Sequence, residues 1–118
     1  MAQHVGLLGS AARAAITNSP TITVAEKYEA AHLVVDVTAG SAFNLLVDIK
    51  GYDQTSGKTY SLLTSSVINA VGTTVLKVGP QYTAGTNVAK DYMPFSWYVT
   101  VTPSGGVGAT YSVGASLI

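Results

Sequence analysis

The sequence contains no cysteine and few charged residues. Among its 118 residues there is no Cys, and Asp, Glu, Lys and Arg together account for only 10% of the chain. The absence of Cys excludes disulfides and thiolate metal sites, so packing or partners must stabilise the fold. Since an average soluble domain has about 25% charged residues, we expect an unusually uncharged surface.

The few charges that are present cancel. Six basic residues balance six acidic ones, and the formal net charge is +0. Without an excess of positive charge, neither nucleic acid nor an anionic membrane is expected as a partner. A small domain of zero net charge tends to self-associate unless a partner covers its surface, so the composition indicates a component of an assembly.

Long hydrophobic runs are also missing. No stretch approaches the ~20 apolar residues that span a bilayer, so no transmembrane helix is predicted. The N-terminal segment is rich in Ala and Gly, but no basic stretch precedes its apolar part and Arg13 interrupts it. This pattern is typical of an arm rather than a signal peptide. The length fits one domain, and we predict an N-terminal arm over residues 1–20 and a folded domain over residues 21–118.

The chain does have repeated alternation of apolar and polar residues. The segment Phe95–Thr102, for example, places Phe95, Trp97 and Val99 on one face of a strand. Further strands are predicted over His32–Thr38, Phe43–Lys50, Tyr60–Leu63, Val75–Val78 and Thr110–Ile118. Turns separate these segments, and no helical period is sustained. The sequence therefore predicts an all-β fold, an antiparallel β-sandwich of the Ig-like or jelly-roll-like type, with about six to eight short strands.

A polar turn connects two of these strands. The residues from Asp53 to Thr59 include no large apolar side chain, and Gly57 can supply the positive φ that a hairpin loop needs. The Gly-Lys-Thr sequence in this turn matches the end of a phosphate-binding loop, but five residues rather than four separate Gly51 from Gly57. The turn also leads into a strand, whereas a phosphate-binding loop leads into a helix. A nucleotide site is therefore not predicted.

Residues with catalytic or metal-binding chemistry are few and scattered. His4 and His32 are the only imidazoles, and no motif places either beside a nucleophile and a carboxylate. Asp36 and Asp48 can approach each other if their strands are neighbours, but both fit the solvent face of a sheet better. We therefore expect no enzyme, no metal site and no cofactor.

Two segments are predicted to bind a partner. The polar connection from Gln81 to Pro94 is long for a compact domain, and tyrosine and methionine side chains flank it. The N-terminal arm can become ordered on binding. The residues expected to make contacts are Val5, Leu7, Leu8 and Arg13 in the arm and Tyr82, Lys90, Tyr92 and Met93 in the long connection.

Several segments resemble a family of small proteins encoded among the head genes of tailed bacteriophages. They are, in order, HLVVDVTAG, LLVDIKGYDQTSGKTYSLL, GTTVLKVGP, MPFSWYVTVTP and ATYSVGASL, and they cover most of the chain, roughly from Leu33 to Ile118. The chain departs from the family pattern at Gln81, where a glycine is usual after the proline. It also departs at Tyr98, where a basic residue is common.

Some members of this family look like capsid decoration or cement proteins, which bind the outside of the shell and lock neighbouring capsomers. The resemblance therefore implies a structural protein of the virion, made in the host cytoplasm and bound to the capsid exterior. The partners that it implies are the major capsid protein and further copies of the chain itself, as a homo-oligomer and specifically a trimer. Each contact can be weak because many copies act together on one lattice.

Two alternatives stay open from the sequence. The same sandwich fits a tail or baseplate component, which the location of the protein in the virion would reveal. The other alternative is an adhesin module that binds host carbohydrate, with Tyr82, Tyr92 and Trp97 as aromatic platforms. This second alternative requires saturable sugar binding that depends on at least one of these rings.

Overall fold

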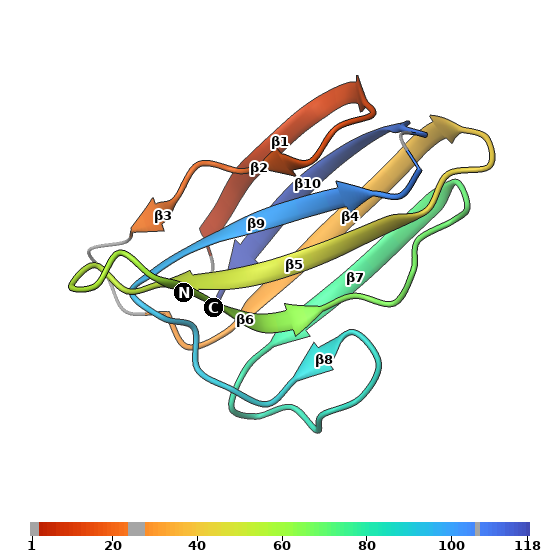
Figure 1. Ribbon diagram of the computed structural model, residues 1–118. Helices are drawn as coiled ribbons and strands as arrows, with labels where there is room; N and C mark the ends of the chain where they lie inside the picture. The colour runs from red at the N-terminus through yellow and green to blue at the C-terminus, as the bar shows by residue number, and fades with distance from the viewer. Residues whose placement is uncertain (1–2, 24–27, 106) are drawn as a thin grey trace.

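The protein folds as two β-sheets packed face to face, as the computed structural model in Figure 1 shows. The structure describes residues 3–23, 28–105 and 107–118. The first sheet has the strand order β1-β10-β4-β7-β8, and the second has the order β2-β9-β5-β6, with β3 also paired to β9. The strands are β1 (Gln3–Arg13), β2 (Thr17–Asn18), β3 (Ile22–Thr23), β4 (Ala31–Gly40), β5 (Leu45–Tyr52), β6 (Thr59–Thr64), β7 (Gly72–Val78), β8 (Val88–Ala89), β9 (Ser96–Pro103) and β10 (Ala109–Leu117).

The pairing within the sheets is antiparallel except between β7 and β8, which run parallel. Strands β2, β3 and β8 have only two residues each, and the seven longer strands carry the sandwich. The predicted all-β antiparallel sandwich is therefore confirmed. In the part of the chain that the structure describes, no helix has the length and hydrophobicity of a membrane span.

The N-terminal segment lies differently from the prediction. Instead of forming a separate arm, the described part of it contributes β1, which pairs along β10 from Gln3 opposite Leu117 to Arg13 opposite Ala109. Two register shifts, between Gly6 and Leu8 and again before Ala11, interrupt the pairing. Bulges of this kind break the two-residue alternation, and this explains why the sequence did not indicate a strand here. Residues 1 and 2 of the predicted arm lie outside the described residues.

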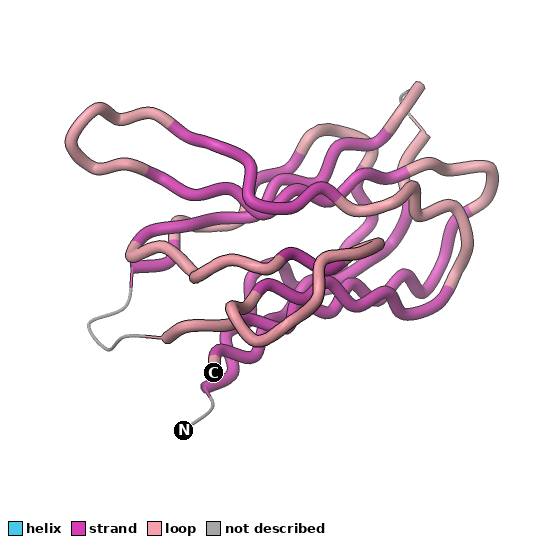
Figure 2. The backbone as a smooth tube through the Cα atoms, turned by 90° about the horizontal axis from the view of Figure 1, so that it is seen from below, coloured by secondary structure: helices cyan, strands magenta, loops and turns pink. Residues whose placement is uncertain are grey.

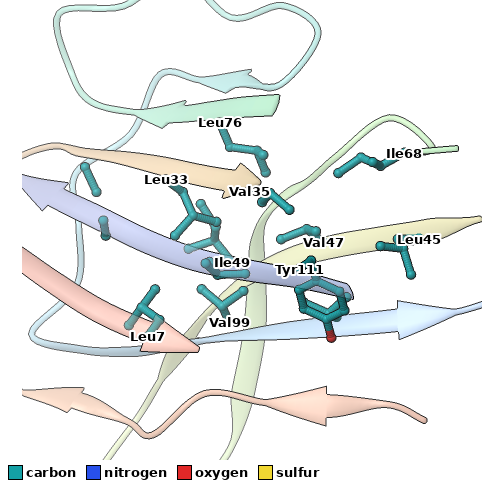
Figure 3. Packing of buried hydrophobic residues seen from close by; sticks show 14 of the residues in the cluster. Leu7, Leu33, Val35, Leu45, Val47, Ile49, Ile68, Leu76, Val99 and Tyr111 are labelled. Atoms are coloured by element: carbon teal, nitrogen blue, oxygen red, sulfur yellow. The ribbon is translucent and has the colours of Figure 1, made fainter. Parts of the chain in front are cut away.

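The core lies between the two sheets (Figure 3). Alternate residues of β4 and β5 point inward, and their side chains, among them Leu33 and Ile49, are completely buried. From β9 and β10, the rings of Trp97 and Tyr111 fill the same layer and are each only 1% exposed. Burying a large apolar side chain contributes about 1.5–3 kcal/mol, so this alternation is the main source of stability in a chain without disulfides.

Phe95 departs from the predicted face of its strand. The sequence grouped it with Trp97 and Val99, which are both buried. However, β9 begins only at Ser96, and the Phe95 side chain is 61% exposed. The two-residue period holds only where the backbone is extended and paired, so it does not constrain a residue that precedes the strand.

The turn between β5 and β6 has the geometry that its sequence predicts. Gly57 has a φ of 72°, and the backbone N–H of Asp53 donates to the Lys58 carbonyl over 2.9 Å. The Asp53 carboxylate accepts a 2.7 Å hydrogen bond from the Ser56 hydroxyl and further bonds from the N–H groups of Thr55 and Ser56. The side chain of Asp53 thus holds the loop from inside, as aspartate commonly does in turns.

The connections between strands gather at two opposite ends of the sandwich (Figures 1 and 2). At one end lie residues 14–16, 41–44, 65–71, 104–105 and 107–108, which follow or precede the paired ends of β1, β4, β5, β7, β9 and β10. At the other end lie the hairpin turn 53–58, residues 90–95 and the paired outer ends of β1 and β10. Residues 79–87 run back along the sandwich, and there the Asn87 side chain accepts a hydrogen bond from the Ser66 N–H and donates one to the Ser66 hydroxyl. The exposed side chains of these two ends differ in chemical character.

Candidate interaction surface

Exposed aliphatic side chains gather at the first of these ends. We call this surface the apolar end and define it as Ile16, Leu46, Val67, Val71, Pro103 and Val107. Ile16 is 66% exposed in the connection between β1 and β2, and Val71 and Val67 are 56% and 52% exposed in the connection between β6 and β7. Isolated exposed aliphatic residues are common, but a group of them on one surface usually marks a contact.

Two hollows lie at the apolar end. One has a volume of about 430 Å³ and is lined by Asn44, Leu46, Val67, Thr102, Pro103 and Ser104. The other, of about 270 Å³, lies where small residues at or next to the ends of β1, β4 and β10 meet, among them Ala14, Ala39 and Gly108. Gly108 is needed there because a Cβ atom at this position would overlap the Arg13 carbonyl. The apolar end therefore combines protruding aliphatic side chains with open hollows.

Arg13 is the one charged side chain at the apolar end within the described ranges. Its guanidinium donates to the carbonyl of Tyr111 over 2.9 Å and to the carbonyl of Gly9. It also lies over the Tyr111 ring, 4.8 Å from the ring centroid, which is the distance of a cation–π contact. Arg13 is therefore bound by its own chain, and the surface around it is aliphatic and uncharged.

The opposite surface has different chemistry, and we call it the aromatic end. It comprises Tyr60, Tyr92 and Phe95 together with the charged residues of the hairpin turn and the long connection, which are Asp53, Lys58, Lys90 and Asp91. Tyr92 is 59% exposed and Phe95 61%, whereas the Tyr60 ring lies against the backbone at Gly51, where a Cβ atom would overlap it. The ring thus covers a glycine in the neighbouring strand, as aromatic residues often do in sheets.

Asp53 is the titratable group of the aromatic end whose environment is clearly altered. The hydrogen bond from the Ser56 hydroxyl, followed by the one from the Thr55 N–H, lowers the pKa of the Asp53 carboxyl from its usual 3.8. Both donors favour the ionised carboxylate. The hairpin turn therefore presents a negative charge beside Lys58.

The predicted contact residues of the N-terminal segment all lie on β1, and they have different surroundings. Leu7 is only 5% exposed and belongs to the core, so it is not available to a partner. Val5 and Leu8 are partly buried and pack against the same core. Arg13 lies at the apolar end, where its guanidinium is held as described above. Because β1 pairs with β10 and packs against the core, most of this segment is part of the folded domain and is not available to a partner.

Of the predicted contact residues of the long connection, some are buried in the fold and others are exposed. Met93 is 9% exposed and its backbone N–H donates to the carbonyl of Glu29, so it anchors the connection. Tyr82 is partly exposed, and its hydroxyl bonds to Nε2 of His32 on β4. Lys90 and Tyr92 are exposed and remain candidates for contact with a partner.

The residues of the apolar end were not identified from the sequence. They lie far apart along the chain, and only the order of the strands brings Ile16, Val67 and Val107 to the same end. The available signal was weak, because these three are aliphatic residues in segments without sustained alternation. Such a residue cannot be distinguished from a buried loop anchor without knowledge of the fold.

The carboxylates considered as a catalytic pair lie on opposite outer faces of the sandwich. Asp36 belongs to β4 in the first sheet and accepts a 3.3 Å hydrogen bond from Thr73. Asp48 belongs to β5 in the second sheet and accepts a 2.8 Å hydrogen bond from Ser61. The whole core separates them, so they cannot act on one bond. Among residues 3–23, 28–105 and 107–118, no group of three or more His, Cys, Asp or Glu side chains could hold a metal ion.

A shallow trough of about 410 Å³ crosses the outer face of the first sheet. Its walls include His4 on β1, and Val34 and Asp36 on β4, while its floor is formed by the small residues of β10. The His4 ring lies 3.2 Å from the position that a Cβ atom of Gly114 would take, so the ring covers this glycine. The trough is lined by more polar residues than the two hollows of the apolar end.

The fold is similar to that of a protein of prophage origin. The crystal structure of the SPBc2 prophage-derived protein YomS matches 99% of this chain and 94% of its own, with a TM-score of 0.60. The two sequences are 8% identical, so the likeness concerns the fold. No protein-family model matches this chain, and no curated protein sequence matches it. The resemblance to phage head-gene proteins therefore rests on the strand and turn motifs quoted above.

Proposed function

We propose that this protein is a structural protein of a bacteriophage virion, specifically a decoration or cement protein on the capsid exterior. The observation that carries this proposal is the placement of exposed hydrophobic side chains at both ends of one sandwich, where a single copy can bridge two neighbours. The fold shared with a prophage-derived protein and the head-gene motifs of the sequence agree with it.

In this proposal the aromatic end binds the major capsid protein. Tyr92 and Phe95 are exposed and can act as anchors in pockets of the shell, since aromatic residues are enriched at the centres of interfaces. Lys90 and Asp91 lie beside them and can select the partner by charge. Copies of the protein associate into a trimer, so that many weak contacts together resist the internal pressure of the capsid.

The proposal is tested with capsids that lack the protein. We expect the purified chain to co-sediment with such capsids and to raise the temperature at which they release their DNA. The double variant Tyr92→Ala/Phe95→Ala should bind at least about 10-fold more weakly, because it removes both anchors. Tyr92→Phe, which keeps the ring, is the matched control. If the wild-type chain neither sediments with the capsids nor protects them, the decoration function is rejected.

A carbohydrate-binding adhesin is the second candidate, because Tyr92 and Phe95 expose two aromatic rings at one end. Trp97, which the sequence had suggested as a platform, is 1% exposed and cannot contact a sugar. A glycan array distinguishes the two functions, since an adhesin must show saturable sugar binding that Tyr92→Ala abolishes. A tail or baseplate role shares the same structural class and is distinguished by locating the protein in the virion.

A further inference from the structure

We propose that Tyr82 and His32 form an anchor that positions residues 90–92, the exposed part of the long connection at the aromatic end. The inference rests on the proposed function for its role in capsid binding, but the anchor itself is a property of the isolated chain. The sequence predicted Tyr82 as a residue that contacts a partner. In the structure its hydroxyl bonds to Nε2 of His32 on β4, so Tyr82 acts on the contact surface through its own chain.

The Tyr82 side chain is held by three contacts. Its hydroxyl bonds to His32, and the centroids of the two rings are 5.7 Å apart. Nζ of Lys77 on β7 lies over the Tyr82 ring, 5.9 Å from its centroid, which is within the range of a cation–π contact. The ring also covers Gly79, where a Cβ atom would overlap both the ring and the Ala30 methyl group. Tyr82 therefore ties the connection to β4, to β7 and to its own first residue.

Gly79 links this anchor to the contact residues. Its backbone N–H donates to the Ala89 carbonyl over 3.1 Å, directly before residues 90–92. On the other side of these residues, the N–H of Met93 donates to the Glu29 carbonyl over 3.1 Å. Residues 90–92 are thus a short segment between two fixed points. Such a segment loses little conformational freedom when it binds, and this favours affinity.

The charge of His32 changes the strength of the anchor. Lys77 on β7 lies directly opposite His32 in the sheet, Ser116 on β10 is the neighbour of His32 on the other side, and His4 on β1 follows Ser116. Like charges directly opposite each other destabilise a sheet. Protonation of His32 places a second cation beside Lys77, and protonation of His4 adds to this positive charge. The proton therefore weakens the packing around Tyr82.

The nearest carboxylates along the chain are too distant to offset this repulsion. Glu29 and Asp36 lie three and four positions from His32. Extended backbone of this length spans about 10–13 Å, which is at or beyond the screening length in physiological salt. Since histidine gains its proton between about pH 8 and pH 5, the anchor is strongest at the upper end of this range.

The first measurement uses the isolated chain, without capsids. The protection factor of the Gly79 amide against hydrogen exchange reports on its bond to Ala89. At about pH 8, Tyr82→Phe should lower this factor by about 2- to 10-fold, because it removes one hydrogen bond. Tyr82→Ala should lower it further, since the ring is lost as well. Tyr98→Phe, which removes a tyrosine hydroxyl from the outer face of β9, is the matched control and should leave the factor unchanged.

The pH dependence separates this anchor from simple packing of the ring. In the wild-type chain the Gly79 protection factor should fall by up to about 5-fold between about pH 8 and pH 5, because of the repulsion between like charges. In His32→Gln it should stay constant, since an amide oxygen can accept the bond from Tyr82 without titrating. Unchanged protection in both Tyr82 variants overturns the inference, and so does a pH response that persists in His32→Gln.

Capsid binding tests the consequence for the contact surface. The apparent dissociation constant rises as the fraction of copies in the binding conformation falls, so Tyr82→Ala should bind about 3- to 10-fold more weakly than the wild-type chain. Weaker binding with unchanged Gly79 protection would make Tyr82 a contact residue and overturn its positioning role, as would equal binding. A wild-type chain that does not bind capsids rejects the decoration function alone, because the exchange measurements do not require a capsid.

Discussion

The two ends of the sandwich are both built from connections between strands, yet they present different chemistry. The apolar end exposes aliphatic side chains such as Ile16 and Val71 around two hollows, and its one charge is bound internally. The aromatic end exposes Tyr92 and Phe95 beside Lys90 and Asp91. Aliphatic contacts have no direction, whereas rings and charges fix orientation and partner. The two ends therefore suit different kinds of contact, and the proposed function assigns the contact with the shell to the aromatic end.

The core connects the two ends, and we expect a cavity in the core to have the largest effect on stability and binding. Trp97→Ala should lower the free energy of unfolding by about 3–5 kcal/mol, because Trp97 is 1% exposed and its loss leaves a large cavity. Self-association and capsid binding should then fall together. Denaturant unfolding measures the change, with Phe95→Ala as the control, since this neighbouring ring is 61% exposed and its removal should change stability by less than about 0.5 kcal/mol.

The second prediction tests whether the apolar end influences binding at the other end. If the proposed trimer is held together at the apolar end, Val67→Asp should weaken binding to capsids by about 100-fold, because a dissociated trimer loses the avidity of linked contacts. Sedimentation at several protein concentrations measures this loss. Restoring trivalency with a fused trimeric coiled coil should recover the binding. Failure of that rescue would mean that the apolar end itself contacts the shell.

The third prediction tests whether a change at the aromatic end affects self-association. Tyr92→Ala should weaken capsid binding by about 10-fold, since an exposed aromatic anchor contributes roughly 1–2 kcal/mol to an interface. The same variant should keep the wild-type mass in solution, because Tyr92 precedes Met93, whose N–H bonds to Glu29 near the start of β4, at the opposite end from Ile16 and Val67. A parallel loss of self-association in Tyr92→Ala would show that the two ends are not independent.

The fourth prediction concerns a buried polar atom beneath the apolar end. The hydroxyl of Tyr111 is buried and has no hydrogen-bond partner among the described residues. Tyr111→Phe should therefore stabilise the fold by about 1 kcal/mol, while the ring stays in place beneath Arg13. Chemical denaturation tests this expectation, and Tyr98→Phe on the outer face of β9 should be neutral. A destabilised Tyr111→Phe protein would indicate a water molecule or partner group bound to the hydroxyl.

The smallest effect is expected from pH at the aromatic end. Because the folded state lowers the pKa of Asp53, the carboxylate stabilises the turn above the unfolded value of 3.8, and this contribution is lost as the pH falls through the folded value. The protection factor of the Gly57 amide, which corrects the exchange rate for its intrinsic pH dependence, should therefore fall below about pH 3.8, while protection in the loops of the apolar end responds less. In Asp53→Asn this loss of protection at Gly57 should be absent. A pH response that persists in this variant would assign the effect to another group.

Much of the fold follows from local patterns in the sequence. Alternation over β4, β5 and β10 identifies which residues are buried, because side chains of a paired strand must point to opposite faces. In β9 the apolar face is also buried as expected, but Ser96 and Thr100 of the opposite face are buried as well. The turn at Gly57 follows from its glycine and the absence of apolar residues. Where the backbone is irregular, alternation no longer predicts which side chains are buried. The bulges of β1 interrupt the alternation, and Phe95 precedes β9 and is exposed.

The sequence by itself determined that the chain forms alternating strands around an uncharged, disulfide-free core, because these properties depend on neighbouring residues and on composition. Only the tertiary structure decided which surface is apolar. Ile16, Leu46, Val67 and Val107 lie towards one end of the sandwich because β1, β5, β7 and β9 all begin or end there. The same strand order places Asp36 and Asp48 on opposite faces. Such proximity arises from long-range pairing, which no local pattern in the sequence encodes.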